Sequence, residues 1–146
     1  MNEKLLQFIW QFQYYQKQQC TTTQGETLYI ERPGILNLNQ GPDFSEALIR
    51  IGQTTWAGNI ELHLRSSDWY KHRHEADIRY SNIILHVVWE DDQPVKDGRN
   101  NRVPTFVLTS RVSALLLDRY RSMMVTKLPV PCHSFLPILN HLGWTA

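Results

Sequence analysis

Residues 56–64 read WAGNIELHL, and their strict alternation of side-chain type decides the fold. In a β-strand, successive side chains point to opposite faces of the sheet. Glu61 and His63 therefore share one face with Asn59. The other face carries Trp56, Gly58, Ile60, Leu62 and Leu64. The pattern predicts a strand whose polar face holds an acid and an imidazole about 6 to 7 Å apart at their Cα atoms.

The segments around this strand predict the rest of a sheet. Residues 47–51, ALIRI, alternate in the same way, and the GQTT that follows is typical of a turn, so the two strands are expected to form a hairpin. Residues 82–90, NIILHVVWE, are almost continuously apolar, as in a central strand buried on both faces. Residues 27–34 and 103–110 predict two further strands.

Three segments predict helices, and one predicts a loop. Residues 3–17 repeat apolar side chains at helical spacing, residues 66–80 begin with good N-cap residues, and residues 113–124 are rich in leucine. The last helix is expected to turn inward Leu115, Leu116 and Tyr120. Residues 35–43, with their Asn, Gly and Pro, predict a structured loop. The expected fold class is α/β, a mixed sheet flanked by helices, in the order α-β-β-β-α-β-β-α.

The composition limits the class of protein. The 146 residues are 42% hydrophobic, enough for one domain with a core, and 15 basic against 14 acidic side chains create no global field for nucleic acid. Cys20 and Cys132 have no metal-ligand spacing and are expected to be reduced thiols. The sequence lacks the pattern of a signal peptide and of a membrane span. It predicts a cytoplasmic protein without membrane contact.

Asp43 follows Gly41 and Pro42 at the start of the predicted hairpin. Pairing of the two strands would bring Asp43 near Glu61 and His63. Two carboxylates meeting there would form an oxygen-rich site suited to Mg²⁺ or Mn²⁺, which could activate water and neutralise charge on a phosphate oxygen. Alternatively, Glu61 and His63 lie on the solvated face of an ordinary strand, and Asp43 belongs to a turn.

The order GPDF at 41–44, then IELH at 60–63, resembles the PD-(D/E)XK nuclease superfamily. The resemblance implies a core of helix, three strands, helix and strand, in which Asp43 and Glu61 hold a divalent metal. His63 stands where the superfamily has a lysine that orients the attacking water or stabilises the transition state. Because a histidine can act as a general base near neutral pH, the resemblance implies catalytic roles for Asp43, Glu61 and His63.

A longer resemblance covers the chain from the first helix to about Tyr120. The pattern NQGPDF, W.GNIELH, SSDW..H.H..D..Y and ILHVVWE resembles a bacterial family known as a domain of unknown function, which brings no activity with it. The expected organisation is a single α/β nuclease-like domain over 1–126. A Pro-containing segment, 127–146, is expected to begin a further region. The nuclease superfamily often adds a glutamate from its first helix, where Glu3 is the only acid.

Histidines and neighbouring acids form a second group of candidates: His63, His72, His74, His86, Asp68 and Asp77. In a helix, Asp68 and His72 share one face. His74 and Asp77 share another. Histidine and aspartate together favour Zn²⁺, Mn²⁺ or Fe²⁺ over Mg²⁺, so His72, His74 and Asp77 are an additional candidate site. Alternatively, His72 and His74 lie on a solvated helix. Asp68 is then a helix cap and His86 a hydrogen-bonded core residue.

Aromatic and basic residues raise the question of nucleic-acid binding. Three tryptophans could stack on bases, although core packing explains them better; they are Trp56, Trp69 and Trp89. Three arginines near the last helix could contact phosphates, and a solvated helix face explains them as well. The candidates are Arg111, Arg119 and Arg121.

Three functions are compatible with the sequence. The first is a metal-dependent phosphodiesterase that uses Mg²⁺ or Mn²⁺ on DNA or RNA. The second is a non-catalytic module of the same fold that binds nucleic acid or protein through Arg119 or Arg121. The third is a metallohydrolase with histidine and carboxylate ligands that binds zinc or iron and acts on a small molecule.

Overall fold

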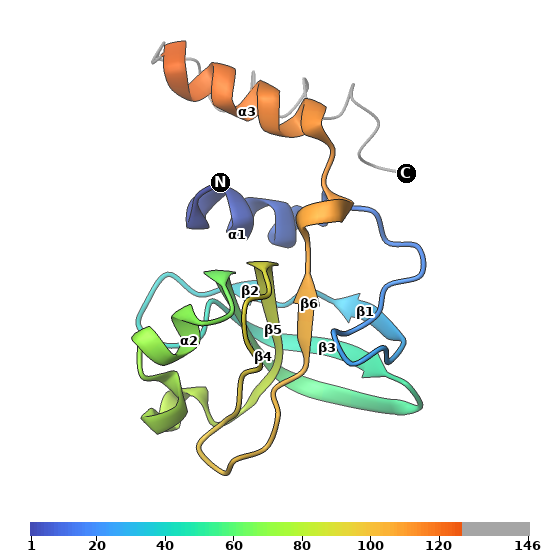
Figure 1. Ribbon diagram of the computed structural model, residues 1–146, viewed down its shortest axis with the longest axis vertical. Coiled ribbons are helices and arrows are strands. Elements are labelled where there is room, and N and C mark those ends of the chain that lie inside the picture. The colour runs from blue at the N-terminus through green and yellow to red at the C-terminus, as the bar shows by residue number, and fades with distance from the viewer. Residues whose placement is uncertain (127–146) are drawn as a thin grey trace.

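The computed structural model describes residues 1–126, so Cys132 and the predicted segment 127–146 lie outside the described residues. It shows a curled, mixed β-sheet with three α-helices in the described part (Figure 1), which confirms the predicted α/β class. The strands are β1 (Leu28–Arg32), β2 (Ile35–Leu36), β3 (Phe44–Ile51), β4 (Thr54–Arg65), β5 (Ile83–Glu90) and β6 (Thr105–Val107). The α-helices are α1 (Glu3–Phe12), α2 (Asp68–Lys71) and α3 (Ala114–Thr126).

The sheet combines an antiparallel half with a parallel half. Its strand order is β1-β3-β4-β5-β6, and β2 also pairs with β3. Pairing is antiparallel from β1 to β4 and parallel from β4 to β6. The two-residue strand β2 lies in the segment predicted as a loop, because Ile35 and Leu36 pair with the start of β3. The observed order of elements therefore contains a strand that the sequence did not predict.

The β3–β4 hairpin is the predicted one, with an irregularity at its open end. The pairing register shifts between Phe44 and Ala47, and Glu46 there adopts a left-handed backbone with φ 58°. Such a bulge bends the strand and redirects the side chains beside it. It lies directly after Asp43 and so sets where the chain enters the sheet.

Helix α1 is shorter than predicted. Its first turn is capped by the side chain of Asn2, which accepts a hydrogen bond from the backbone of Leu5 at 2.8 Å. The helix ends at Phe12 because Gln13 is left-handed and its N–H turns back to the carbonyls of Ile9 and Trp10. The prediction that it continues to residue 17 is wrong.

The segment predicted as one helix over 66–80 is broken into three short pieces. After α2 come two 3₁₀ turns, η1 (His74–Ala76) and η2 (Ile78–Tyr80). The break falls at Arg73, which is left-handed with φ 54°. The predicted continuous helix is therefore wrong, and the break separates the pair Asp68 and His72 from the pair His74 and Asp77.

Two clusters of buried side chains hold the fold together. The main core lies between α1 and the apolar face of the sheet and includes Leu6, Ile9, Ile60, Leu62, Leu85 and Val87. A smaller core of Trp69, Tyr80, Val95 and Val103 lies under the α2–η2 segment. Strand β5 contributes five consecutive buried residues, which confirms the predicted central strand. In Figure 1, α1 lies above the sheet and α3 above α1.

Two sets of side chains were predicted to be buried, and each prediction is confirmed only in part. On α3, Leu116 is buried and Tyr120 partly buried, but Leu115 is 48% exposed, so its predicted inward orientation is wrong. Core packing of tryptophan is confirmed for the others but wrong for Trp56, which is 49% exposed. Cys20 is a buried free thiol. Within residues 1–126, no helix has the length and apolar character needed to cross a membrane.

Candidate metal centre

The polar face of β4 is as deeply buried as its apolar face. Glu61 is 5% exposed and His63 1%, against 0% for Ile60 and 3% for Leu62. The α2–η2 segment covers this face and brings further histidines onto it. The interpretation of Glu61 and His63 as a solvated strand face is therefore wrong. Burial of ionisable groups is costly unless partners or a metal compensate it.

Asp43 lies against Glu61, as the hairpin predicts. The backbone N–H of Asp43 donates to Glu61 Oε1 at 3.0 Å, and the N–H of Leu62 donates to Asp43 Oδ2 at 2.9 Å. Gln7 of α1 donates from Nε2 to Asp43 Oδ1 at 2.9 Å. Each carboxylate is thus oriented by fixed N–H donors, and both retain lone pairs that a cation could use.

The two carboxyl groups share an environment that favours their neutral form. Burial, followed by the charge of Glu61, raises the pKa of Asp43 to about 7. Burial likewise raises the pKa of Glu61 to about 7, against hydrogen bonds from Asp43 that lower it. The charge of Glu3, the one acid of α1, also raises the pKa of Glu61. Such perturbation is typical of functional sites and of metal sites without their ion.

His74 reaches the other oxygen of Glu61. Its Nε2 lies 2.7 Å from Glu61 Oε2, and His63 Nε2 lies 3.6 Å from the same oxygen. The contact of His74 does not have hydrogen-bond geometry, and both of its ring nitrogens are buried without a hydrogen-bond partner among the described residues.

His63 lies at the centre of the histidines. Its Nε2 is 3.2 Å from His72 Nδ1, and its Nδ1 is 2.6 Å from His86 Nε2. His63, His72 and His74 can each offer one ring nitrogen such that the three nitrogens lie within 4.8 Å of one another. His86 is fully buried and hydrogen-bonded, as the sequence predicts.

The buried imidazoles are held in their neutral form. Burial, with smaller contributions from the neighbouring histidines, lowers the pKa of His63 to about 2. Burial lowers the pKa of His86 to about 3 and also lowers that of His74. Neutral imidazole is the form that binds metals. A lowered pKa also makes His63 a weaker proton acceptor, and its role as a general base stays a prediction.

The break at Arg73 is what brings His72 and His74 to the same place. In a continuous helix, residues two apart point about 200° from each other. Arg73 lies between the two histidines and reverses the local winding. Left-handed backbone is unfavourable for arginine and is found where surrounding structure enforces it, often at functional sites.

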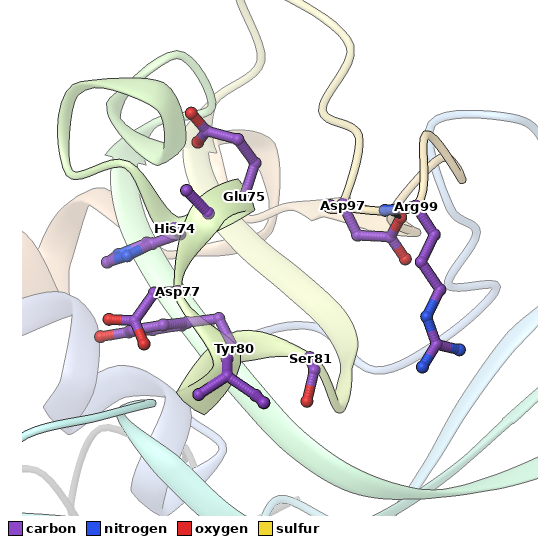
Figure 2. Close-up of a pocket in the computed structure, with 10 residues that line it drawn as sticks. His74, Glu75, Asp77, Tyr80, Ser81, Asp97 and Arg99 are labelled. Atoms are coloured by element: carbon purple, nitrogen blue, oxygen red, sulfur yellow. Dashed lines mark hydrogen bonds between the residues drawn. The ribbon is translucent and has the colours of Figure 1, made fainter.

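A hollow of about 310 Å³ opens beside His74. Figure 2 shows the rings of His74 and Tyr80 stacked on one side and Arg99 on a facing turn; the two ring centroids are 3.8 Å apart. Burial, then the charges of Glu61 and Asp43, raise the pKa of Tyr80 to about 12. Tyr80 and His74 thus line the hollow together, and His74 links it to the carboxyl pair through its contact with Glu61.

The predicted acids of the α2–η2 segment do not join the three histidines. Asp77 binds Arg79 at 2.6 Å and borders the hollow. Asp68 is the first residue of α2, where its Oδ2 accepts from the N–H of Arg65 and its Oδ1 pairs with Lys71. The N-cap position itself belongs to Ser67.

The three candidate phosphate-binding arginines have separate environments. Arg111 donates to the carbonyls of the segment after α1, at Gln16, Gln18 and Gln19. Its guanidinium is thus engaged in holding the fold, and its predicted role as a phosphate contact is not favoured. Arg121 pairs with Asp118 at 3.8 Å, and both Arg119 and Arg121 are exposed on α3. A phosphate contact from these two stays a prediction.

Two neighbours of the site were missed by sequence reasoning. Gln7 sits between apolar positions of α1, and no local signal distinguishes it from the other glutamines there. Tyr80 closes the histidine-rich segment, and its ring reaches the site only because the segment is broken into short turns.

The fold and the site together define a class of protein: a mixed α/β domain with a candidate metal centre buried on one face of its sheet. Family comparison narrows the assignment. Residues 3–145 match the family described as "Protein of unknown function (DUF2851)", and the chain belongs to this family. This confirms the predicted membership of a domain family of unknown function. No curated protein and no solved structure matches the chain.

Proposed function

We propose that this protein is a metal-dependent phosphodiesterase, a nuclease-like enzyme that acts on DNA or RNA. The observation that supports it is the buried contact between Asp43 and Glu61, with His63 on the same face of β4. An acid after Gly-Pro and an acid two residues before an imidazole are the features that resemble the PD-(D/E)XK superfamily. Their proximity in space is what that mechanism requires.

The residues present fit a divalent cation. Asp43 and Glu61 would hold Mg²⁺ or Mn²⁺ through carboxylate oxygens, the ligands that hard cations prefer. The adjacent histidine nitrogens favour Mn²⁺ over Mg²⁺. When bound, such an ion would neutralise charge on a phosphate oxygen and increase the acidity of water. The raised pKa values of both carboxyls fit a site whose charge a cation normally balances.

The side chains of the site would orient the reactants. Gln7 and the backbone N–H of Leu62 fix the two oxygens of Asp43. His63, locked by His86, would position the attacking water by hydrogen bonding. Since His63 is neutral and stands where the superfamily has a lysine, another cation must meet the phosphate. Arg99 on the wall of the hollow is the proposed candidate, whereas Arg119 and Arg121, on α3 beyond α1, would contact more distant phosphates.

The test is a nuclease assay on single- and double-stranded DNA and RNA with Mg²⁺ or Mn²⁺. Asp43→Asn and Glu61→Gln keep the size of the side chain and remove its charge. We expect each to lower the rate by roughly 100-fold or more, because a metal ligand is lost. The matched control is Glu31→Gln, an exposed acid on β1. Full activity in both site variants, or no cleavage by the wild type under any condition, would refute the proposal.

The three histidine nitrogens favour a second candidate, a metallohydrolase that acts on a small molecule. Histidine-rich sites select zinc or iron rather than magnesium. The hollow of about 310 Å³ is at the lower end of the range for ligand pockets. Purified protein that holds zinc or iron, hydrolyses small activated esters and leaves nucleic acids intact would favour this candidate over the nuclease.

A further inference from the structure

We infer that Glu61 bridges two metal sites: an oxygen-rich site shared with Asp43, and a nitrogen-rich site for a Zn²⁺-class ion formed with His63, His72 and His74. The first site rests on the proposed function. The second stands on the geometry of the histidines alone.

The two oxygens of Glu61 face different groups. Oε1 accepts from the N–H of Asp43 at 3.0 Å, whereas Oε2 lies 2.7 Å from His74 Nε2 and 3.6 Å from His63 Nε2. Paired ions in hydrolytic sites lie about 3.5–4 Å apart and need a group that serves both. A carboxylate with one oxygen turned to each set of ligands is such a group.

The spacing of the nitrogen-rich set fits one ion. Two ligands of a tetrahedral zinc ion, each about 2.0–2.1 Å from the metal, lie about 3.3 Å apart. The measured separations are 3.2 Å between His63 and His72, and 2.7 and 3.6 Å from Glu61 to His74 and His63. The three histidine nitrogens as a set lie within 4.8 Å of one another, so the four ligands would close around one ion with side-chain movements of roughly 1 Å or more.

His74 provides an independent indication of a missing partner. Its side chain is 8% exposed, and neither ring nitrogen makes a hydrogen bond to another described residue. Buried polar atoms in native proteins are almost always paired, and the exceptions call for an explanation. Its Nε2 is directed at Glu61 Oε2, so a cation shared by the two atoms would satisfy both.

His86 is the positioning residue for this site. A metal-binding histidine normally donates its second N–H to a fixed partner, which sets its tautomer and ring orientation. Here His63 Nδ1 lies 2.6 Å from His86 Nε2. If Nδ1–H of His63 donates in this contact, the lone pair on its Nε2 faces His72 and Glu61 and is free to bind the ion. Binding of the ion at Nε2 would take the place of the water-positioning role proposed above for this ring.

Metal titration of the full chain after removal of bound ions tests the inference. Zn²⁺ and Mn²⁺ affinities and stoichiometries are measured by calorimetry, and Co²⁺ is added as a spectroscopic substitute for Zn²⁺. We expect one Zn²⁺ per chain, a separate site for Mn²⁺, and the strong visible absorption of four-coordinate Co²⁺. His72 is exposed, so His72→Ala should fold. It should weaken Zn²⁺ binding by about 10- to 100-fold.

Two further variants separate the sites. Asp43→Asn should remove Mn²⁺ binding but leave Zn²⁺ affinity within about 3-fold, because Asp43 does not belong to the nitrogen-rich set. Lys71→Ala, an exposed neighbour of His72 that pairs with Asp68, is the matched control and should leave both affinities unchanged.

Two results would overturn the inference: a single equivalent of metal that both Asp43→Asn and His72→Ala weaken, or no Zn²⁺ binding by folded wild-type protein. Failure of the nuclease proposal can be distinguished from failure of this inference. Protein that binds two ions as described but cleaves no nucleic acid would refute the proposed function and support the bridged pair of sites.

Discussion

Strands β4 and β5 are buried on both faces, and the two faces differ in chemistry. The apolar face carries Ile60, Leu62, Leu85 and Val87, which pack under α1 in the main core. The polar face carries Glu61, His63 and His86, which are also buried, each 5% exposed or less. The parallel register sets Ile60 beside Leu85 and Glu61 beside His86, so each face is continuous across both strands.

The two faces have opposite effects on the free energy of folding. Burial of the apolar face is favourable by roughly 25 cal/mol per Å² of apolar surface. Burial of Glu61 with the imidazoles of His63, His86 and, from the segment that covers them, His74 is unfavourable unless partners or an ion compensate it. The polar face includes buried nitrogens on His74 and His86 that lack hydrogen-bond partners among the described residues. We interpret this face as maintained for function.

The largest expected effect on stability is on the apolar face. Leu85 is fully buried, so Leu85→Ala should lower the free energy of unfolding by about 2–5 kcal/mol by leaving a cavity. Urea denaturation of the purified protein measures it. Leu38→Ala, at a site that is 87% exposed, is the control and should have almost no effect. Equal losses of stability in the two variants would contradict the stabilising role assigned to the apolar face.

The next largest effect is expected where the two strands meet. A Cβ atom on Gly58 would lie 2.7 Å from Ile84 Cγ2 and 2.9 Å from the carbonyl oxygen of Asn82. Gly58→Ala should therefore destabilise the protein by about 1–3 kcal/mol through overpacking. Thermal unfolding compares it with Thr55→Ala, an exposed position on the same strand. An unchanged midpoint would show that β5 can move away from β4.

A smaller effect on stability is expected just before α2, where the segment that covers the polar face begins. Asp92 accepts hydrogen bonds from the hydroxyls of Ser66 and Ser67 and from the N–H of Ser67. These bonds, those of Ser67 first, lower the pKa of Asp92 to about 2. Asp92→Asn should cost on the order of 1 kcal/mol at pH 7.

The sign of the pH dependence follows from that lowered pKa. The carboxylate of Asp92 stabilises the folded state above its ordinary pKa, and this contribution is lost as the pH falls from about 4 to about 2. The difference between wild type and Asp92→Asn should therefore shrink over this range in urea titrations. Asp91→Asn, at the exposed neighbouring position, is the control. A difference that stays constant down to pH 2 would contradict the assignment.

The smallest effect on stability is expected on the polar face. Glu61→Gln keeps the volume of the side chain and removes a buried charge, so the metal-free protein should change by less than about 1 kcal/mol or become more stable. The same variant should lose metal affinity. Chemical denaturation without metal measures the first effect, and a loss above about 3 kcal/mol would mean that Glu61 serves the fold.

The sequence predicted the two-faced strands but not how the polar face is covered. The alternation around Glu61 and the apolar run around His86 are strong local patterns, because each strand has one environment per face. The left-handed Arg73 has no comparable signal. Arg73 is exposed and gives no apolar pattern. A helical period over 66–80 separates the histidines that the structure brings together.

The carboxyl pair was predictable in outline. Asp43 and Glu61 meet because the hairpin is short and its register is fixed by one buried face. The bulge at Glu46 and the hydrogen bond from Gln7 could not be predicted, because both depend on tertiary contacts across the sheet and with α1. His74 reaches Glu61 because the chain is broken at Arg73, which the sequence also did not predict.

Anomalous diffraction from crystals grown with Zn²⁺ tests most directly whether the polar face is a metal centre. The account predicts a peak at the zinc edge about 2.0–2.2 Å from Glu61 Oε2 and from the nitrogens of at least two of the three histidines. A map without a peak there, with Glu61 and His74 joined by an ordinary hydrogen bond, would contradict it.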